Sequence, residues 1–486
     1  MVSISASYLK GDFMATIHVM VGIPGSGKST YAKKLSEEFG IKVISSDDVR
    51  DLNPKMEEKD IFGEVYRLIS CEIKEGKDVI LDATNSTKFI RSRIVERLKP
   101  YNITYDMVAY YFPIDYKTCY ERIERRNQKR IDRYFPLDVL ESYYKKAEAP
   151  SINEGFKEVK IIDQTPLGDV KEILLKNVVT RIDQGYAFFY SDERGEVRGQ
   201  NGTRSKNSGA KIDFNTNFRL ASVSKQFIAY GIYLLINSGK LSYDTKLNDI
   251  FYVGEYAKDI TIKNLLNHTS GLLDYEDMEH TDEQIHDIDV LEYVKRQDKT
   301  YFTPGSKYQY SNTAFVILGL IIEKVSGRRL GDYMKEKVFL EASMKDTVVD
   351  YEKETIINNR AYGHLEIDGK ILEKDQYWCS ATIGDGGIYS NVSDLIKWLN
   401  YLIKMYDNGS EFFKANILPD GTNSEYALGI RHVTRRGVDI IYHCGETIGF
   451  NTIIGFVPSL NKKFIFLTNL GNHSCDQVLN NLVSIM

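Results

Sequence analysis

The N-terminal third of the chain alternates short apolar runs with charged segments of helical period. The apolar runs between residues 16 and 163 read TIHVMV, DVILDAT, DMVAYYF and EVKIID. Continuous apolar runs of this length are typical of strands buried on both faces, and the segments between them have the spacing of covering helices. The pattern therefore predicts an α/β domain with a parallel sheet and helices on both faces.

The pattern changes at residues 164–168, where Gln-Thr-Pro-Leu-Gly interrupts it. Residues 185–199 predict a hairpin, residues 222–238 a long helix, and residues 451–470 two antiparallel strands around a Pro-Ser-Leu-Asn turn. Strands at both ends of this segment, with a mostly helical middle, predict an α+β domain with one antiparallel sheet built from both ends. We therefore expect a multidomain chain with an extension at 1–13, a first domain at 14–165, a partly helical linker at 166–183 and a second domain at 184–486.

A chain of 486 residues is long enough for two or more domains of about 100–200 residues each. Its composition, 42% hydrophobic and 27% charged, is ordinary for globular proteins, and no apolar run approaches the ~18 residues of a membrane span. The first residues lack the layout of a secretory signal, and Met14 is an alternative start. The five cysteines show no metal-binding spacing, so we expect reduced thiols, a cytoplasmic protein and no membrane partner.

The formal net charge of −5 argues against binding of nucleic acid through bulk positive charge. Positive charge gathers only on one predicted helix and the loop after it. These residues are Arg122, Arg125, Arg126, Lys129, Arg130 and Arg133. Arginines at i and i+4 share a helix face, so Arg126 and Arg130 can clamp a phosphoryl group; a solvated charged face is the alternative.

A glycine-rich loop follows the first apolar run and opens a predicted helix, which is the context of a phosphate-binding loop. Its backbone N–H groups and the helix N-terminus would bind the phosphates of ATP or GTP. Lys28 would bridge the terminal phosphates, and the Ser29 hydroxyl would hold Mg²⁺. The nucleotide-binding residues expected from this loop are Gly22, Gly25, Ser26, Gly27, Lys28, Ser29 and Thr30.

A second group of polar residues, Asp47, Asp48 and Arg50, follows the strand-like run IKVIS. At the end of a strand in such a sheet, Asp47 can accept the proton of an attacking hydroxyl, and Arg50 can bind an acceptor phosphate. The alternative is that an aspartate merely caps the following helix.

These motifs, with Asp82-Ala-Thr-Asn85, Arg126-Asn-x-Lys-Arg130 and the segment from Pro136 to Lys145, resemble the kinase domain of phage and bacterial polynucleotide kinases over most of residues 14–163. The resemblance implies that Asp47 is the general base, that Arg50 binds the 3′-side phosphate of the acceptor, and that Arg126 and Arg130 form a lid over the nucleotide. The favoured acceptor is a 5′-hydroxyl of RNA or DNA; related kinases act on sugar nucleotides or small molecules. The chain shows no phosphatase motif in this region.

Candidate chemistry of a different kind begins at Ser222-Val-Ser-Lys225. Serine and lysine lie one turn apart at the start of an apolar helix, where the helix dipole and a neutral amine can activate a hydroxyl. The spacing also occurs at Ser7, Ser142, Ser208 and Ser459, and an isolated pair is more often a helix cap with a surface lysine. Further support comes from Tyr310-Ser-Asn312, whose tyrosine can shuttle protons, and from His443-Cys-Gly445 before the last strands.

In order and spacing these three motifs resemble class C β-lactamases, D-alanyl carboxypeptidases and esterases of that fold, from residue 185 to 486. The resemblance implies that Ser222 is acylated, that Lys225 and Tyr310 transfer protons, and that Asn312 orients the substrate amide. Backbone N–H groups of Ser222 and Glu446 would form the oxyanion hole. Together with Asn312 and Glu446, His443 and Gly445 would bind the acyl substrate. The motif Lys-Thr-Gly is replaced here by His443-Cys-Gly445, which weakens the expectation of β-lactam hydrolysis. His268 is expected to be structural.

The sequence thus predicts a bifunctional cytoplasmic enzyme, in which ATP and Mg²⁺ serve phosphorylation of a hydroxyl and Ser222 hydrolyses a small ester or amide. Two alternatives remain open. The kinase could act on a small molecule or sugar nucleotide beside an esterase or peptidase. Or the hydrolase fold could be a silent module that binds an acylated ligand and regulates the kinase.

Overall fold

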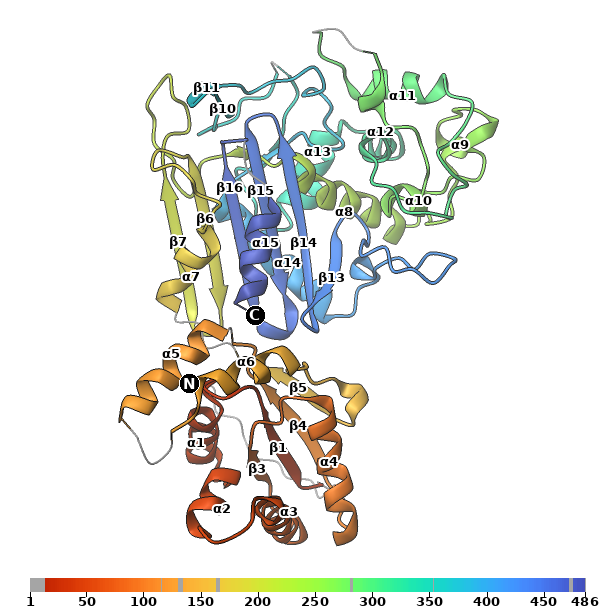
Figure 1. Cartoon of the computed structure of the whole chain (residues 1–486). Helices are drawn as coiled ribbons and strands as arrows, with labels where there is room; N and C mark the ends of the chain where they lie inside the picture. The colour runs from red at the N-terminus through yellow and green to blue at the C-terminus, as the bar shows by residue number, and fades with distance from the viewer. Residues whose placement is uncertain are drawn as a thin grey trace. The chain divides into compact units, whose positions relative to one another are not determined.

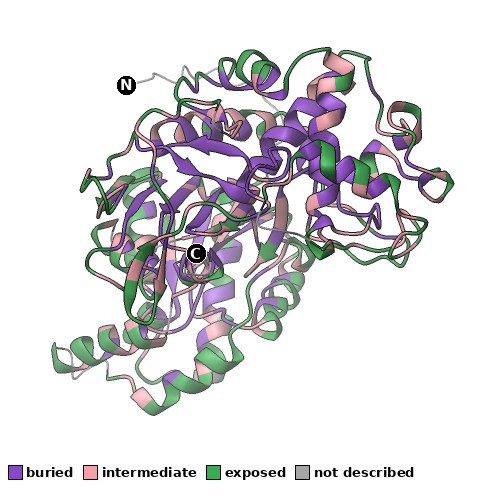
Figure 2. Ribbon diagram, turned by 90° about the horizontal axis from the view of Figure 1, so that it is seen from above, coloured by how far each residue is buried: buried purple, intermediate pink, exposed green. Residues whose placement is uncertain are grey.

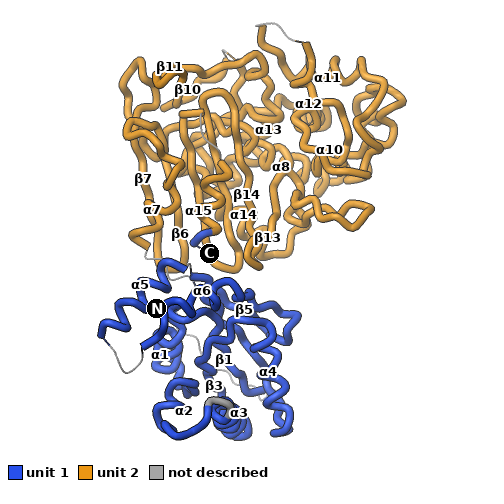
Figure 3. The backbone as a smooth tube through the Cα atoms, viewed as in Figure 1, with its two compact units in different colours: residues 1–165, 484–486 blue, residues 166–483 orange. Residues whose placement is uncertain are grey.

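The computed structural model describes residues 14–114, 116–129, 134–162, 167–279, 283–352, 354–471 and 475–485. The chain divides into two compact units, one of residues 1–165 with 484–486 and the other of residues 166–483 (Figure 3). Within the described ranges, no helix has both the length and the apolar character needed to cross a lipid bilayer.

The first unit contains a five-stranded parallel sheet with the order β2-β3-β1-β4-β5 (Figure 1). Its strands are β1 (Thr16–Val21), β2 (Lys42–Ser45), β3 (Val79–Asp82), β4 (Asp106–Tyr111) and β5 (Glu158–Ile161). Val19 and Val21 of β1 enter one hydrophobic cluster, whereas Met20 enters another. Because alternate side chains of a strand point to opposite faces, the sheet is buried on both sides, which confirms the predicted α/β architecture.

The helices of the first unit connect these strands, so the carboxyl ends of all five parallel strands meet at one edge of the sheet. They are α1 (Lys28–Phe39), α2 (Ser46–Leu52), α3 (Glu58–Lys74), α4 (Lys88–Leu98), α5 (Tyr116–Lys129) and α6 (Leu137–Lys146).

The second unit is organised around a six-stranded antiparallel sheet with the order β13-β14-β15-β16-β6-β7. These strands are β6 (Tyr186–Asp192), β7 (Gly195–Asn201), β13 (Arg431–Arg435), β14 (Val438–Thr447), β15 (Phe450–Val457) and β16 (Lys462–Thr468). The hairpin β6–β7 pairs with the last strand, with Phe188 opposite Phe466. The sheet therefore joins the two ends of the unit, as the hydrophobic pattern predicted.

Short strands that the pattern did not predict lie in the middle of the unit. A three-stranded sheet has the order β8-β12-β9, and β10 pairs with β11. Their bounds are β8 (Phe218–Arg219), β9 (Val348–Val349), β10 (His364–Ile367), β11 (Lys370–Glu373) and β12 (Ile388–Ser390). Strands of two to four residues give too few positions for an alternating pattern to be read.

The helices of the second unit include α7, which lies in the segment expected as the linker and is grouped with this unit. They are α7 (Leu167–Leu175), α8 (Ser224–Asn237), α9 (Leu247–Ile250), α10 (Ile262–Leu266), α11 (Asp287–Lys295), α12 (Asn312–Ser326), α13 (Leu330–Met334), α14 (Val392–Asp407) and α15 (Cys475–Ser484).

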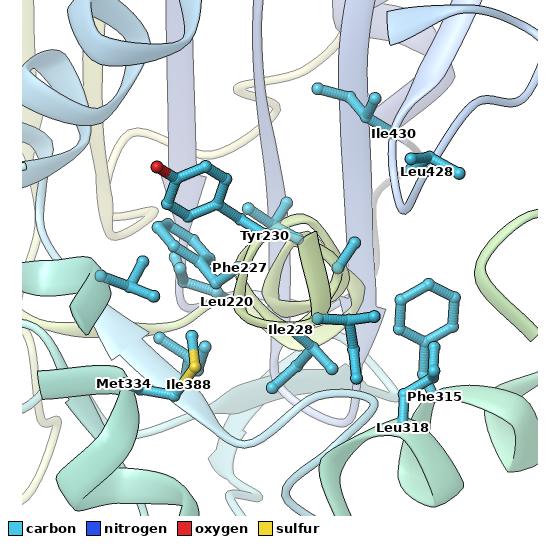
Figure 4. Packing of buried hydrophobic residues seen from close by; sticks show 14 of the residues in the cluster. Leu220, Phe227, Ile228, Tyr230, Phe315, Leu318, Met334, Ile388, Leu428 and Ile430 are labelled. Carbon is cyan, nitrogen blue, oxygen red and sulfur yellow. The ribbon is translucent and has the colours of Figure 1, made fainter. Parts of the chain in front are cut away.

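Helix α8 lies at the centre of the main hydrophobic core of the second unit, and buried residues are concentrated on the strands and the central helices (Figures 2 and 4). Phe227 and Tyr230 project from α8, and the Phe227 ring stacks on Trp398 of α14 with centroids 4.5 Å apart. All eight residues of β15 are buried. This packing holds the N-terminus of α8, where Ser222 and Lys225 lie, against the sheet.

Candidate active sites

The loop of residues 22–27 connects β1 to α1 at the carboxyl end of the central strand. Gly25 and Gly27 have left-handed backbone, with φ of +80° and +89°. A Cβ on Gly25 would lie 2.7 Å from the carbonyl oxygen of Cys119. Glycine is therefore required by both the backbone angle and the close approach of α5, and the loop keeps the shape of a phosphate cradle.

Lys28 begins α1, and its ammonium is buried against this loop. Its Nζ donates to the carbonyl oxygen of Ile23 (2.8 Å) and to Ser26 Oγ (3.3 Å). Burial lowers the pKa of Lys28 to about 8, although the nearby Asp82 carboxylate opposes the shift. A phosphate in the cradle would supply negative charge in place of these neutral acceptors and raise this pKa again.

Asp82, the last residue of β3, is a candidate site residue that the sequence analysis quoted without giving it a role. The residue is 6% exposed, and burial raises its pKa, while an interaction with the Ser29 hydroxyl opposes that shift. Strand β3 is the neighbour of β1, so Asp82 stands beside the start of α1, where Ser29 and Thr30 are exposed. Carboxylate and hydroxyl oxygens fit Mg²⁺. The sequence offered one signal for a role of Asp82: like Asp47, it stands at the end of an apolar run that predicts a buried strand.

Asp47 and Arg50 form an ion pair on α2, which begins at the carboxyl end of β2. Arg50 Nη1 donates to Asp47 Oδ1 at 2.6 Å, and the Asp47 side chain is 62% exposed. The helix is capped by Ser45, whose Oγ accepts from the backbone N–H groups of Asp47 (3.1 Å) and Asp48 (3.4 Å). Ser45 is therefore the residue that caps α2, and the Asp47 carboxylate is open to solvent.

The basic helix α5 contacts the phosphate-binding loop. The pKa of Lys28 is lowered mainly by burial, and the charge of Arg126 adds to that shift. Arg122, one turn earlier on the same face, has its Nη1 3.5 Å from the carbonyl oxygen of Gly25. The Arg122 side of this helix therefore faces the glycine-rich loop. Arg130 and Arg133 lie outside the described residues.

Ser222 lies in a 3₁₀ turn, Ala221–Val223, directly before α8. The α-helix begins at Ser224, two residues later than the sequence predicted. The preceding Ala221 is buried and has φ of +47°, a left-handed conformation that costs a residue with a Cβ about 1–2 kcal/mol. Such strain persists only where the surrounding structure holds it, and here it places the Ser222 hydroxyl at the positive end of the α8 dipole.

Lys225 is fully buried beneath Ser222. Its Nζ donates to Ser222 Oγ (3.0 Å), to Asn312 Oδ1 (2.8 Å) and to the carbonyl oxygen of Asp385 (2.9 Å). Burial lowers the pKa of Lys225 to about 8. Three carboxylates oppose this shift: Asp385, Asp274 and Glu276. A lysine that loses its proton near neutral pH, in contact with a hydroxyl, can act as that hydroxyl's base.

The Tyr310-Ser-Asn312 motif completes this constellation. Burial holds the pKa of Tyr310 well above its ordinary value, so the phenol stays protonated, and an interaction with the Ser222 hydroxyl opposes this shift. The Tyr310 ring centroid is 5.1 Å from Lys225 Nζ. Asn312 Oδ1 accepts from Lys225, while Nδ2 donates to Glu276 Oε1 at 2.9 Å. The asparagine therefore links Lys225 to the exposed carboxylate of Glu276.

His443 occupies the place where the related motif has a lysine. Its Nε2 accepts from the Tyr426 hydroxyl (2.8 Å), and Nδ1 donates to the carbonyl oxygen of Cys444 (2.6 Å). Burial lowers the pKa of His443 well below its ordinary value, so the imidazole is neutral. It does not provide the positive charge that a lysine would offer to a substrate carboxylate.

Strand β14 passes directly beside the turn that carries Ser222. A Cβ on Gly445 would lie 2.0 Å from the carbonyl oxygen of Leu220 and 2.5 Å from Thr452 Oγ1. Thr452 Oγ1 in turn donates to that same carbonyl oxygen at 2.7 Å. Only glycine permits this approach, and it brings the backbone of the next residue, Glu446, close to the Ser222 turn.

Three acidic residues near Lys225 could not be recognised from the sequence: Asp274, Glu276 and Asp385. Asp274 Oδ2 accepts from the backbone N–H of Asn312 (3.1 Å), and Asp385 Oδ2 accepts from the Tyr275 hydroxyl (2.8 Å). Burial raises the pKa of both Asp274 and Glu276. No spacing rule connects Asp274, Glu276 or Asp385 to Ser222, so no pattern in the sequence indicates them.

A positive charge that was also missed comes from Arg431 in β13. It is half-buried, and its guanidinium carbon lies 5.8 Å from the ring centroid of Tyr426. Its positive charge opposes the burial that raises the pKa of Tyr310, and it adds to the burial that lowers the pKa of His443. His268 has a supporting position: its Nδ1 accepts from the backbone N–H of Ser311 (3.1 Å), and its ring packs on Tyr310 with centroids 4.3 Å apart.

Two family models match the chain: one described as Beta-lactamase over residues 175–483, and one described as AAA domain over residues 17–150. Penicillin-binding protein 4* of Bacillus subtilis is 32% identical over 279 residues, covering 52% of this chain and 61% of that protein. A D-aminopeptidase of Cereibacter sphaeroides is 27% identical over 258 residues, covering 48% of this chain and 46% of that protein. The chain thus spans less than two thirds of either relative.

Solved structures show the same fold for the second unit. A penicillin binding protein from Bacillus halodurans has a TM-score of 0.57 and 22% identity, over 66% of this chain and 100% of that chain. The D-amino acid amidase from Ochrobactrum anthropi SV3 complexed with D-phenylalanine has a TM-score of 0.56 and 21% identity, over 66% and 98%. Since the Beta-lactamase model matches more than half of this chain, the chain belongs to the beta-lactamase family, and it carries an AAA domain ahead of that region.

Proposed function

We propose that the second unit is a serine hydrolase that cleaves an ester or amide through an acyl-enzyme at Ser222. The observation that carries this proposal is the 3.0 Å contact of Lys225 Nζ with Ser222 Oγ, in a setting where burial lowers the lysine pKa to about 8. Neutral Lys225 takes the serine proton as Oγ attacks the carbonyl carbon. Tyr310 gives a proton to the leaving group, and water then releases the acyl group by the reverse path.

The backbone N–H groups of Ser222 and Glu446 are the proposed oxyanion donors. Their support is the close approach of β14 to the Ser222 turn, which the absence of a side chain at Gly445 allows. Donors fixed in place before reaction stabilise the tetrahedral intermediate without reorganisation, and losing one such donor typically costs about 10²–10³ in rate.

The substrate class we favour carries a free amino group next to the scissile bond. Glu276 is exposed at the site, and its Oε1 lies 2.9 Å from Asn312 Nδ2, while Asp274 and Asp385 add negative charge on the same side. A substrate ammonium would be attracted to this side. The D-aminopeptidases among the relatives are named for substrates of this kind.

A carboxylate-bearing substrate is the second candidate, because Arg431 supplies positive charge beside Tyr310 and His443. A peptide with a free C-terminus would use that charge. The relative named penicillin-binding protein 4* is compatible with such a substrate.

Three compounds distinguish these classes: D-alanine p-nitroanilide, its N-acetyl derivative, and N-acetyl-D-alanyl-D-alanine. Preference for the free amine, lost in Glu276→Gln, would support aminopeptidase or amidase activity. Preference for the free carboxylate, lost in Arg431→Met, would support carboxypeptidase activity. Turnover of none of them, nor of simple p-nitrophenyl esters, by folded protein would favour the alternative of a silent module that binds an acylated ligand.

For the first unit we propose transfer of the terminal phosphoryl group of ATP or GTP to a hydroxyl. Support comes from the glycine cradle, from Lys28 within it, and from the contact of Ser29 with Asp82, which fits a Mg²⁺ site. Bound Mg²⁺ would supply positive charge to the phosphate oxygens. Lys28 and the face of α5 that carries Arg126 bind and orient the phosphates, with Arg130 proposed as a second lid arginine.

Asp47 is the proposed general base for the acceptor hydroxyl, and Arg50 the proposed ligand of an acceptor phosphate. Their 2.6 Å ion pair is half exposed, so an incoming phosphate can compete for Arg50 and leave the Asp47 carboxylate to accept a proton. A 5′-hydroxyl of RNA or DNA is the favoured acceptor; a small molecule or a sugar nucleotide is the alternative. Because the nucleotide is made and held inside cells, we propose a cytoplasmic, bifunctional enzyme.

Transfer of labelled γ-phosphate to a 5′-hydroxyl oligonucleotide tests this proposal, with wild type, Lys28→Ala and Asp47→Ala compared. Transfer that both substitutions abolish would support a polynucleotide kinase. Retained nucleotide binding with transfer only to a uridine-diphosphate sugar or another small hydroxyl compound would overturn the favoured acceptor.

A further inference from the structure

Two cysteines from distant parts of the sequence meet on the side of β14 that faces away from Ser222. Cys444 lies within β14, and Cys475 is the first residue of α15. Cys475 lies against the stretch of β14 that contains Cys444, and the neighbouring Cys444 thiol, together with burial, raises the pKa of Cys475. Cys475 Sγ also donates to the carbonyl oxygen of Thr452 (3.0 Å) and lies 3.6 Å from that of Gly445.

The alternation of β14 explains why both thiols lie on this face. His443 and Gly445 point toward the hydrolase site, where they meet Tyr426 and the backbone before Ser222. Cys444 and Glu446 point the other way. Glu446 Oε1 accepts from the backbone N–H of Cys475 at 3.2 Å, so the first turn of α15 is held against the same stretch of strand.

The two cysteines differ in access to solvent. Cys444 is half-buried, whereas Cys475 is 3% exposed. A reagent from solution would therefore meet Cys444 first, and Cys475 lies beside it as the partner that can react with the product. This is the arrangement of a reactive thiol next to a resolving thiol.

We propose that Cys444 and Cys475 form a redox-responsive dithiol that a peroxide converts to a disulfide, and that this disulfide lowers turnover at Ser222. In the first step the Cys444 thiolate attacks a peroxide oxygen, so that an S–O bond forms, the O–O bond breaks and water leaves. Cys475 then attacks the Cys444 sulfur, an S–S bond forms, and the S–O bond breaks with loss of a second water. Two thiols are oxidised by two electrons and one hydrogen peroxide is reduced to two waters.

The link to turnover follows from how tightly this strand is confined. A disulfide holds its two sulfurs about 2.05 Å apart, so forming it pulls Cys444 and the first turn of α15 toward each other. Cys475 must also give up its hydrogen bond to Thr452, since it loses its S–H proton. Gly445 stands between Cys444 and Glu446 and packs closely against the Leu220 carbonyl oxygen on the Ser222 side. A pull on Cys444 toward α15 therefore shifts Glu446 and its N–H away from Ser222.

The experiment treats the reduced full-length chain with hydrogen peroxide and maps cysteine peptides by mass spectrometry, for wild type, Cys444→Ser, Cys475→Ala and, as the matched control, Cys71→Ser. Cys71 is exposed on α3 in the other unit. The expected result is a Cys444–Cys475 cross-link in wild type and in Cys71→Ser only. Hydrolysis of a p-nitrophenyl ester should fall about tenfold, consistent with a displaced oxyanion donor, and recover with dithiothreitol.

Two results would overturn this inference: Cys444 oxidised to sulfinic acid with no cross-link, or an equal loss of hydrolysis in Cys444→Ser. The effect on turnover rests on the proposed hydrolase function, but the cross-link is read by mass alone. If the cross-link forms in a chain that hydrolyses no ester, the dithiol proposal stands. The proposed function of Ser222, and its control by oxidation, would then be wrong.

Discussion

Lys225 donates to Ser222 Oγ at 3.0 Å from a position with no exposed surface. The same ammonium is held by the Asn312 side chain and by the carbonyl oxygen of Asp385, so its direction is fixed by three acceptors from three different segments. Because burial favours the neutral amine, the geometry that orients Lys225 also prepares it to take a proton.

The pH dependence of hydrolysis should follow Lys225. Its pKa is lowered to about 8 by burial, and only the neutral amine can act as a base, so kcat/KM is expected to rise with pH up to about 8. Well below this value the rate should fall about tenfold per pH unit. The Tyr310 hydroxyl, whose pKa is raised by burial, should add no decline near pH 9. A profile that is flat from pH 6 to 8 in a stable protein would contradict the role of Lys225.

Substitution of Gly445 by alanine should abolish hydrolysis, because the new Cβ would meet the Leu220 carbonyl oxygen at 2.0 Å. Relief requires β14 to move away from Ser222, and the expected loss in kcat/KM is at least about 10². Gly168→Ala is the control, since a Cβ on this α7 residue meets nothing within 4 Å. Unchanged hydrolysis by Gly445→Ala would show that this strand does not contribute to the site.

Gly25→Ala should prevent nucleotide binding while leaving the first unit folded. The substitution places a Cβ 2.7 Å from the Cys119 carbonyl oxygen at a residue with φ of +80°. Gly40→Ala has a similar φ, +69°, but open space around the new Cβ, so it should cost only about 1 kcal/mol of stability. Titration calorimetry with ATP separates the two: binding should be lost in the first variant and kept in the second.

Lys28 should make nucleotide binding pH-dependent. Its pKa in the free protein is about 8, and phosphate favours the charged form, so binding at pH 8 should be accompanied by proton uptake. The affinity for ATP should weaken as pH rises above 8. Calorimetry in buffers of different ionisation enthalpy measures the protons directly, and Lys28→Met should remove the uptake. Equal proton uptake in the variant would assign it to another group.

Asp287 should give the second unit a stability that falls as pH rises. Its two carboxyl oxygens accept from the backbone N–H groups of Ile383 (3.0 Å) and Gly384 (3.1 Å), and burial raises its pKa from 3.8 to about 7. The folded state therefore binds this proton more tightly than the unfolded state. This contribution to the free energy of unfolding is fully present below pH 3.8 and is lost as pH rises through about 7.

Asp287→Ala is expected to lower the free energy of unfolding by about 3 kcal/mol at pH 5, because two buried N–H groups lose their acceptor. The loss should be smaller at pH 8. The exposed Asp298→Ala serves as control and should change little. Denaturant titrations at both pH values measure this loss. An equal loss at pH 5 and pH 8 would show that the protonation of Asp287 does not contribute to stability.

The sequence predicted the elements whose chemistry depends on local spacing. The phosphate cradle is a contiguous loop after a buried strand, and Ser222 and Lys225 are one helical turn apart, so both could be identified before the structure. The antiparallel sheet was predicted from its hydrophobic runs because β6, β15 and β16 are long enough to show them.

The rest of the hydrolase site depends on contacts between segments with no shared pattern. Asp385 binds Lys225 through its backbone carbonyl, which no side-chain motif reveals. Glu276 and Arg431 reach the site from a loop and from an outer strand, and only the folded chain brings them together. The roles of Ser222, Lys225, Tyr310 and the oxyanion donors remain predictions.

The most direct test of the account is covalent labelling of Ser222. The full-length chain is treated with a fluorophosphonate, and the site and rate of labelling are measured by mass spectrometry for wild type, Ser222→Ala, Lys225→Met and, as a control for another Ser-x-x-Lys pair, Ser208→Ala. The account predicts one label on Ser222 in wild type and Ser208→Ala, no label in Ser222→Ala, and labelling slowed by about 10²-fold or more in Lys225→Met. Folded wild-type protein that takes up no label, or a label that persists in Ser222→Ala, would contradict it.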